Sequence, residues 1–254
     1  MNGRSPSEEG KSNQPLKILG ISRFFHRNRF LVLLSLLFIL SMTAPSVVAQ
    51  VSKTNTTIAQ VQPGKNSYES GNFAQAAREL QAAVAEFAAK GDRLSQAVAL
   101  RNLSLVYQQL GQWQDAEGAI AQSISLLQTQ PKNHTQLKLL AEALDVQARL
   151  YRETGRGADA VETWQKATNI YQQINDKIGI AQSKINQASA LQDLGFYPRA
   201  CKVLRELFGL SSSANPELKR QQCNISEAEF KTLKALPVTS INVWGLRSLG
   251  DVLH

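Results

Sequence analysis

Apolar and polar residues follow one another along most of this chain with the three-to-four-residue spacing that places apolar side chains on one face of a helix. The spacing is clearest within residues 94–110, where the apolar positions are Ala97, Leu100, Leu103, Val106, Tyr107 and Leu110. We therefore predict an all-α protein, with helices at residues 63–70, 72–90, 94–110, 113–128, 136–154, 158–174, 177–194 and 197–208.

A short motif marks the turns between these helices: a glycine, an aromatic residue two positions later and an alanine five positions later. It occurs as Gly111, Trp113 and Ala116, as Gly71, Phe73 and Ala76, as Gly195, Tyr197 and Ala200, and in weakened form as Gly155, Gly157 and Ala160. The four glycines lie 40, 44 and 40 residues apart. A fixed period in this range is typical of repeat proteins, and glycine suits a helix end that needs a left-handed residue.

Two further positions keep the same register. Nine residues after each glycine comes a large apolar residue, which is Leu80, Ile120, Trp164 or Leu204. Seven residues before each glycine comes a small residue, which is Gly64, Ser104, Ala148 or Ala188. Small residues let two antiparallel helices approach closely, and the large residues then fill the space toward the next pair.

These motifs resemble the tetratricopeptide repeat (TPR) over roughly residues 60–208, with about four units of 40–44 residues. Pro63, Gln147 and Gln187 stand where the family usually has a large apolar residue, and Gly157 replaces the aromatic residue. The period exceeds the 34 residues of the standard unit, which implies helices about one turn longer, as in bacterial long-repeat variants. The resemblance implies a right-handed α-solenoid whose concave face is formed by the first helix of each pair.

The period fails after Phe208. Residues 209–239 are predicted to be a polar insert with one short helix, because Ser226 to Glu229 form a capping box and Pro237 follows. Residues 240–254 resume the first-helix pattern and are predicted to be the partial fifth repeat. Trp244 on that helix is expected to be partly exposed, and the unfinished repeat is expected to allow association with another chain. Trp113, Trp164 and Tyr107 are predicted to be inter-helix core residues.

Within the family, the array resembles the N-terminal part of bacterial, cyanobacterial-type proteins in which TPR repeats precede a caspase-like CHAT domain. The segment VWGLRSLGDVLH at 243–254 contributes to this resemblance. The CHAT domain itself has no counterpart here, so protease activity is not implied. The resemblance gives an alternative function, in which the chain is the truncated regulatory half of a CHAT-type protease or surface system.

The N-terminal 49 residues have the pattern of a secretory signal. Basic residues precede the apolar run FLVLLSLLFIL at 30–40, and a small-residue exit follows at Ala49. We therefore predict an exported protein, periplasmic or secreted, with residues 50–62 as a linker. The alternative is an uncleaved signal anchor, with residues 30–48 holding the chain to the membrane.

The charge of +8 does not indicate nucleic-acid binding. Residues 1–49 hold six Lys or Arg against Glu8 and Glu9, a net charge of +4, which leaves +4 for the other residues and no basic run with interleaved aromatics. The chain is also predicted to be no enzyme and to bind no cofactor or metal. His26 lies in the leader, His134 in a predicted loop and His254 at the terminus, so that no two can act together.

The predicted ligand is a protein or an extended peptide. The ligand-contacting positions that the TPR resemblance places on the first helices are occupied here by Arg101, Asn102, Gln108, Asp145, Arg149, Arg152, Asn186 and Gln192. Their mixture of Arg, Asn and Gln suits a peptide backbone and acidic side chains. Lys and Asn do not stand where the carboxylate clamp of chaperone-binding TPR proteins needs them.

Cys201 and Cys223 are the two cysteines of the chain. Export would place them in an oxidising compartment, where a bridge would hold the polar insert against the array. The competing interpretation is a pair of unrelated thiols, one half-buried on a helix and one exposed.

Overall fold

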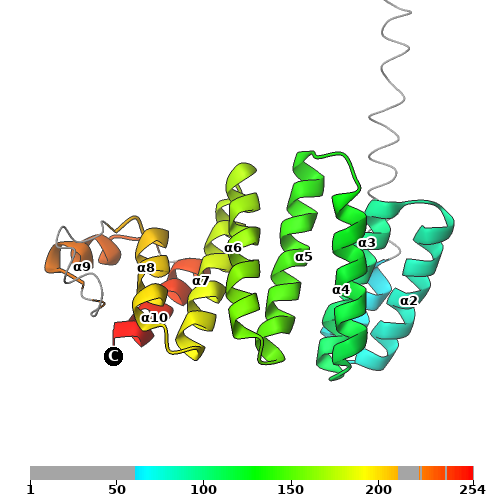
Figure 1. The fold of residues 1–254 in the computed structure, drawn as a ribbon, viewed down its shortest axis with the longest axis horizontal. Helices are drawn as coiled ribbons and strands as arrows, with labels where there is room; N and C mark the ends of the chain where they lie inside the picture. Colours follow the sequence, from blue (N-terminus) through cyan, green and yellow to red (C-terminus); the bar gives the residue numbers. More distant parts are fainter. Residues whose placement is uncertain (1–60, 211–222, 224, 238, 254) are drawn as a thin grey trace, which may run out of the picture. The chain divides into compact units, whose positions relative to one another are not determined.

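The computed structural model describes residues 61–210, 223, 225–237 and 239–253, and within these ranges every regular element is a helix (Figure 1). Residues 61–69 are helical, and the labelled helices follow: α2 Phe73–Ala89, α3 Arg93–Gln109, α4 Trp113–Gln128, α5 His134–Glu153, α6 Gly157–Gln173, α7 Lys177–Asp193, α8 Tyr197–Leu207, α9 Glu227–Lys234 and α10 Ser240–Leu253. The predicted signal segment at 1–49 lies outside the described residues.

Consecutive helices pack as antiparallel pairs, α3 with α4, α5 with α6 and α7 with α8. Each first helix also contacts the first helix of the next pair, α3 with α5 and α5 with α7. Helix α10 packs on both α7 and α8, which is the place of the next first helix. The prediction of an all-α solenoid of helix pairs is confirmed.

The turn inside each pair depends on a left-handed glycine. Gly111 has a φ of +68°, and the N–H of Gln112 donates to the carbonyl of Tyr107 at 2.9 Å while the N–H of Gly111 donates to Gln108 at 3.1 Å. This pair of bonds is a Schellman motif, which satisfies the last carbonyls of α3. Gly71, Gly155 and Gly195 have the same positive φ, so the prediction from the glycine spacing is confirmed.

The predicted close approach of the two helices is also present. Ala76, Ala116, Ala160 and Ala200 on the second helices are all fully buried. A Cβ added to Gly64 would lie 2.6 Å from Leu80 Cγ, so only glycine fits at that crossing. Short side chains therefore set the spacing inside each pair.

Two helices include residues two positions before their predicted starts. Residues 61 and 62, assigned to the linker, are already helical, because Val61 is buried in the first core cluster with Leu80. Helix α5 begins at His134, where a loop was predicted. The Asn133 side chain accepts the N–H of Gln136 at 2.9 Å and so caps the earlier start.

The burial of the aromatic residues agrees only in part with the prediction. Trp164 is 2% exposed and belongs to the core, as expected. Trp113 is 42% exposed, so its assignment to the core was wrong; it is the first residue of α4 and lies at the turn, beyond the contact between the paired helices. Tyr107 is half-buried and its hydroxyl accepts a hydrogen bond from Gln81 at 2.7 Å. Trp244 is 52% exposed, which agrees with the prediction.

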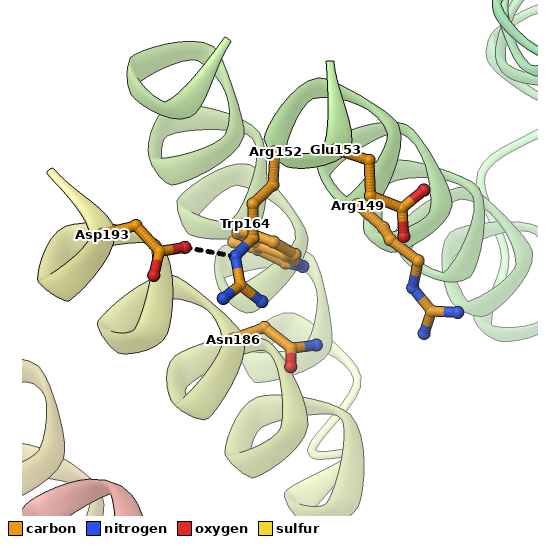
Figure 2. Close-up of a pocket in the computed structure, with 6 residues that line it drawn as sticks. All are labelled: Arg149, Arg152, Glu153, Trp164, Asn186 and Asp193. Carbon is orange, nitrogen blue, oxygen red and sulfur yellow. Dashed lines mark hydrogen bonds and ion pairs between the residues drawn. The ribbon is translucent and has the colours of Figure 1, made fainter. Parts of the chain in front are cut away.

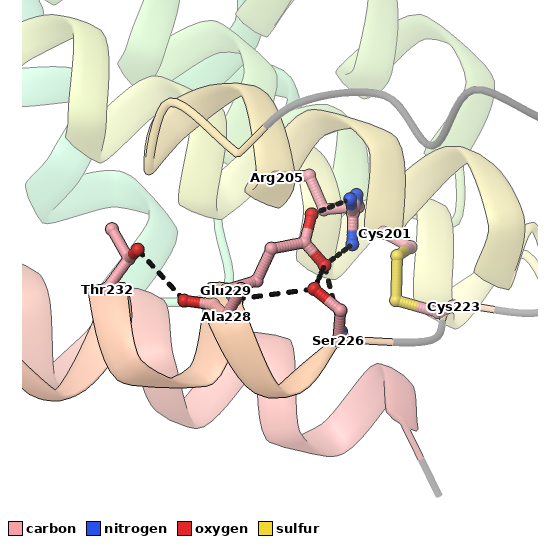
Figure 3. A network of polar contacts seen from close by, with 7 residues as sticks. All are labelled: Cys201, Arg205, Cys223, Ser226, Ala228, Glu229 and Thr232. Carbon is pink, nitrogen blue, oxygen red and sulfur yellow. Dashed lines mark hydrogen bonds and ion pairs between the residues drawn. A yellow bond between two sulfur atoms is a disulfide. The ribbon is translucent and has the colours of Figure 1, made fainter.

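A disulfide joins Cys201 on α8 to Cys223, with 5.7 Å between their Cα atoms (Figure 3). Next to it, Arg205 on α8 forms an ion pair with Glu229 on α9. The same Glu229 accepts from the Ser226 backbone at 2.9 Å and completes the predicted capping box. The covalent bond and the ion pair together hold the segment that begins α9 against α8.

Candidate peptide-binding face

The first-helix face is defined here by the exposed and half-buried side chains of α3, α5 and α7. It carries ion pairs that cross from one first helix to the next. Arg101 on α3 pairs with Glu142 on α5, and Arg152 on α5 pairs with Asp193 on α7 at 2.6 Å. Both pairs join residues 41 positions apart, close to one repeat.

Besides Arg152, three of the predicted contact residues already have partners within the array. Arg101 donates to Glu142 and, at 3.4 Å, to the neighbouring Asn102. The Gln192 amide donates to the carbonyl of Ser248 on α10 at 3.4 Å. These side chains link the first helices to one another or to α10, so a ligand reaches them only by competing with those bonds.

Gln108 does not belong to the face. It is 5% exposed, and its amide nitrogen lies 3.3 Å from the Ser104 hydroxyl in the contact between α3 and α4. The prediction of Gln108 as a ligand contact was wrong, because it follows Ser104 by one helical turn and so shares the packed side of the helix.

Asp145 has a structural role at the centre of the array. Its carboxylate accepts from the Tyr171 hydroxyl of α6 at 2.8 Å and from the Ser183 hydroxyl of α7 at 2.6 Å. Burial raises the pKa of Asp145 to about 6, while the two hydroxyl donors and nearby Arg149 act in the opposite direction. Burial also raises the pKa of Tyr171. Asp145 thus links α5 to α6 and α7 through hydrogen bonds, and little of its surface remains for a ligand.

A cavity of about 230 Å³ opens between the end of α5, α6 and α7 (Figure 2). Its lining residues are Arg149, Arg152 and Glu153 from α5, Trp164 from α6, and Asn186 and Asp193 from α7. Three of the predicted contact residues, Arg149, Arg152 and Asn186, therefore meet at one cavity. They stand on two successive first helices, as the resemblance to TPR proteins implied.

Sequence reasoning did not assign Asp193 or Trp164 to this site. Asp193 stands 41 residues after Arg152, one repeat along, and that spacing could have indicated the pair. Trp164 was assigned to the core alone, whereas it also forms part of the cavity wall. Its position nine residues after Gly155 predicts burial. No feature of the sequence shows that a cavity lies beside it, because that depends on how the helix ends are spaced.

Other kinds of site are not found in the part of the chain that the structure describes. Every helix there is too short or too polar to cross a lipid bilayer. His, Cys, Asp and Glu side chains in these ranges do not gather in groups of three that could hold a metal ion.

Comparison with known proteins decides the fold. No family profile and no curated protein matches the sequence. This chain is similar to a crystal structure of the nearly identical TPR-like repeats of a putative kinesin light chain from Podosopora anserina. The alignment has a TM-score of 0.53 and 18% sequence identity, and it covers 76% of this chain and 93% of that chain. A point variant of the same repeats gives a TM-score of 0.54 and 16% identity over 76% and 86%. The chain has a TPR-like repeat fold.

At these identities the likeness shows the fold of the TPR-like array and nothing about its ligand. It does not test the resemblance to the arrays of CHAT-domain proteins, which stays a prediction. Three of the predicted contacts, Arg149, Arg152 and Asn186, coincide with the cavity on the first-helix face.

Proposed function

We propose that this protein is a non-catalytic scaffold that binds a protein partner through an extended peptide on the first-helix face. The observation that carries the proposal is the cavity between α5, α6 and α7, lined by Arg149, Arg152 and Asn186. A TPR-like fold is in general a protein-interaction module. Guanidinium and amide groups on successive helices supply the donors and acceptors that a peptide backbone and acidic side chains require.

The absence of catalysis is part of this proposal. Asp145, the carboxyl group whose pKa is raised to about 6, would be the natural candidate for a general base. Its two oxygens accept hydrogen bonds from the hydroxyls of Tyr171 and Ser183. This arrangement suits a structural role that joins three helices.

We also propose that the array is exported, with membrane anchoring through residues 30–48 as the alternative. The basic region and the apolar run of the first 49 residues support export. The disulfide between Cys201 and Cys223 is of the kind that persists in oxidising compartments. Mass spectrometry of the protein from the exported fraction tests this: a chain that starts near Gln50 supports cleavage, and one that retains 30–40 indicates an anchor.

The binding proposal is tested by selecting peptides from a display library against the full chain in a mild detergent. The affinity of an enriched peptide is then measured for the wild type, Arg149→Glu and Asn186→Ala. Lys166→Glu is the matched control, because Lys166 is exposed on α6 outside the cavity lining. We expect at least about tenfold weaker binding for the two cavity variants and an unchanged value for the control. A library that yields no binding peptide, or equal affinity for all four proteins, would refute the proposal.

A further inference from the structure

One buried donor in the cavity has no partner. Trp164 is 2% exposed, and its indole nitrogen makes no hydrogen bond within the described residues. Figure 2 shows this nitrogen at the end of the ring that is turned toward Glu153 and Arg149, which line the same cavity. A buried polar group without a partner is costly, so native proteins satisfy nearly all of them. The indole N–H can only donate, so whatever satisfies it must be an acceptor.

The rest of the cavity lining consists of two arginines, two acidic residues and the amide of Asn186. Arg149 forms no ion pair within the described residues, although it lowers the pKa of nearby Asp145. Arg152 uses its Nε on Asp193, and its terminal nitrogens are directed toward Asn186 in Figure 2. Of the two acidic residues in the lining, Asp193 is occupied by Arg152 and Glu153 is exposed to solvent, where its charge is screened.

We propose that the cavity binds a carboxylate of the partner, an Asp or Glu side chain of the bound peptide. One carboxylate oxygen accepts from the Trp164 indole, and the guanidinium of Arg149 pairs with the carboxylate from the rim. A carboxylate offers about four acceptor positions and fits the fork of an arginine, so it can serve both donors at once. This inference rests on the proposed function and specifies the chemical group of the peptide that the first-helix face recognises.

Arg152 can supply a second guanidinium to the bound carboxylate. Arg152 lines the same cavity, and in the view of Figure 2 it passes in front of the end of the Trp164 ring that lies away from the nitrogen. Its ion pair with Asp193 joins side chains that are 40% and 52% exposed, and pairs of this kind hold weakly. Arg152 can therefore exchange Asp193 for the entering carboxylate.

The chain provides a direct spectroscopic test. Its three tryptophans are Trp113, Trp164 and Trp244, and the first and last are largely exposed. In the full chain with Trp113→Phe and Trp244→Phe, the single indole ¹H–¹⁵N resonance comes from Trp164. It is followed in detergent during titration with acetyl-Gly-Glu-Gly-amide and, separately, with acetyl-Gly-Gln-Gly-amide.

We expect the glutamate peptide to move the resonance saturably, with a Kd at least about tenfold lower than that of the glutamine peptide. Adding Arg149→Gln removes this preference, whereas adding Lys166→Gln keeps it. Equal binding of the two peptides, or a resonance that neither peptide moves, overturns the inference. A display-selected peptide that binds without moving the Trp164 resonance leaves the proposed function standing and overturns only the carboxylate site.

Discussion

Ser104 on α3 donates its hydroxyl hydrogen to the carbonyl oxygen of Ala116 on α4, across 2.9 Å. Both residues are fully buried. The small residue and the alanine that recur in the sequence are therefore in direct contact, and their sizes fix the separation of the helix pair.

Enlarging this contact should destabilise the array. We expect Ser104→Leu to lower the free energy of unfolding by about 1–3 kcal/mol through overpacking. Ser104→Ala should cost about 1–3 kcal/mol, since it removes the bond to Ala116 and leaves the buried Gln108 amide without its acceptor. The control is Ser125→Leu, an exposed position on α4, with a change within about 0.5 kcal/mol. Urea denaturation of the full chain gives all three values; similar curves for Ser104→Leu and Ser125→Leu would contradict the packing register.

The turn glycines can be tested with one substitution at two sites. Gly111 has a φ of +68°, so Gly111→Ala places a Cβ in the left-handed region and should cost about 1–2 kcal/mol. Gly118 lies inside α4 with no atom near its added Cβ, so Gly118→Ala should stabilise the protein by up to about 1 kcal/mol. Thermal melting should thus move in opposite directions for the two variants. A melting temperature that does not fall for Gly111→Ala would mean that Gly111 does not set the turn.

Asp145 should make stability depend on pH. Its pKa in the folded protein is about 6, above the ordinary value of 3.8, so the folded state binds this proton more tightly than the unfolded state. The stabilisation is complete below the unfolded pKa and is lost as the pH rises through about 6. The loss amounts to roughly 2–3 kcal/mol between pH 4 and 7.

The measurement is chemical denaturation of the wild type and Asp145→Asn at pH 4, 5, 6 and 7. We expect the free energy of unfolding of the variant to fall less than that of the wild type over this range, because asparagine does not ionise. Asp115→Asn on the exposed side of α4 controls for the loss of one carboxyl group. Parallel profiles for wild type and Asp145→Asn would contradict the role assigned to the buried carboxylate.

Much of the fold was predictable because packing is periodic. The glycine spacing located the left-handed turns, and residues such as Leu80 and Leu204 marked the buried positions. The candidate site was only partly predictable. Helical periodicity assigns residues to a face, yet it does not distinguish a buried glutamine such as Gln108 from an exposed one. Contacts between neighbouring repeats, such as that of Arg152 with Asp193, depend on how the pairs stack.

The disulfide should stabilise the C-terminal part selectively. Closing a loop of 22 residues contributes about 3 kcal/mol in the chain-entropy model. Reduction, or the double substitution Cys201→Ala and Cys223→Ala, should raise hydrogen exchange in α9, which is otherwise held to α8 by the Arg205–Glu229 ion pair. Exchange in α3 and α4 should stay unchanged. Unchanged exchange in α9 after reduction would show that the ion pair and packing suffice.

The central claim, that the first-helix face binds the partner, is tested most directly by photo-cross-linking. A display-selected peptide that carries a photoreactive residue is bound to the full chain, irradiated, and the attachment sites are mapped by mass spectrometry. The account predicts attachment on α3, α5 and α7, including residues beside Arg149 and Asn186. Attachment confined to the second helices α4, α6 and α8 would contradict it.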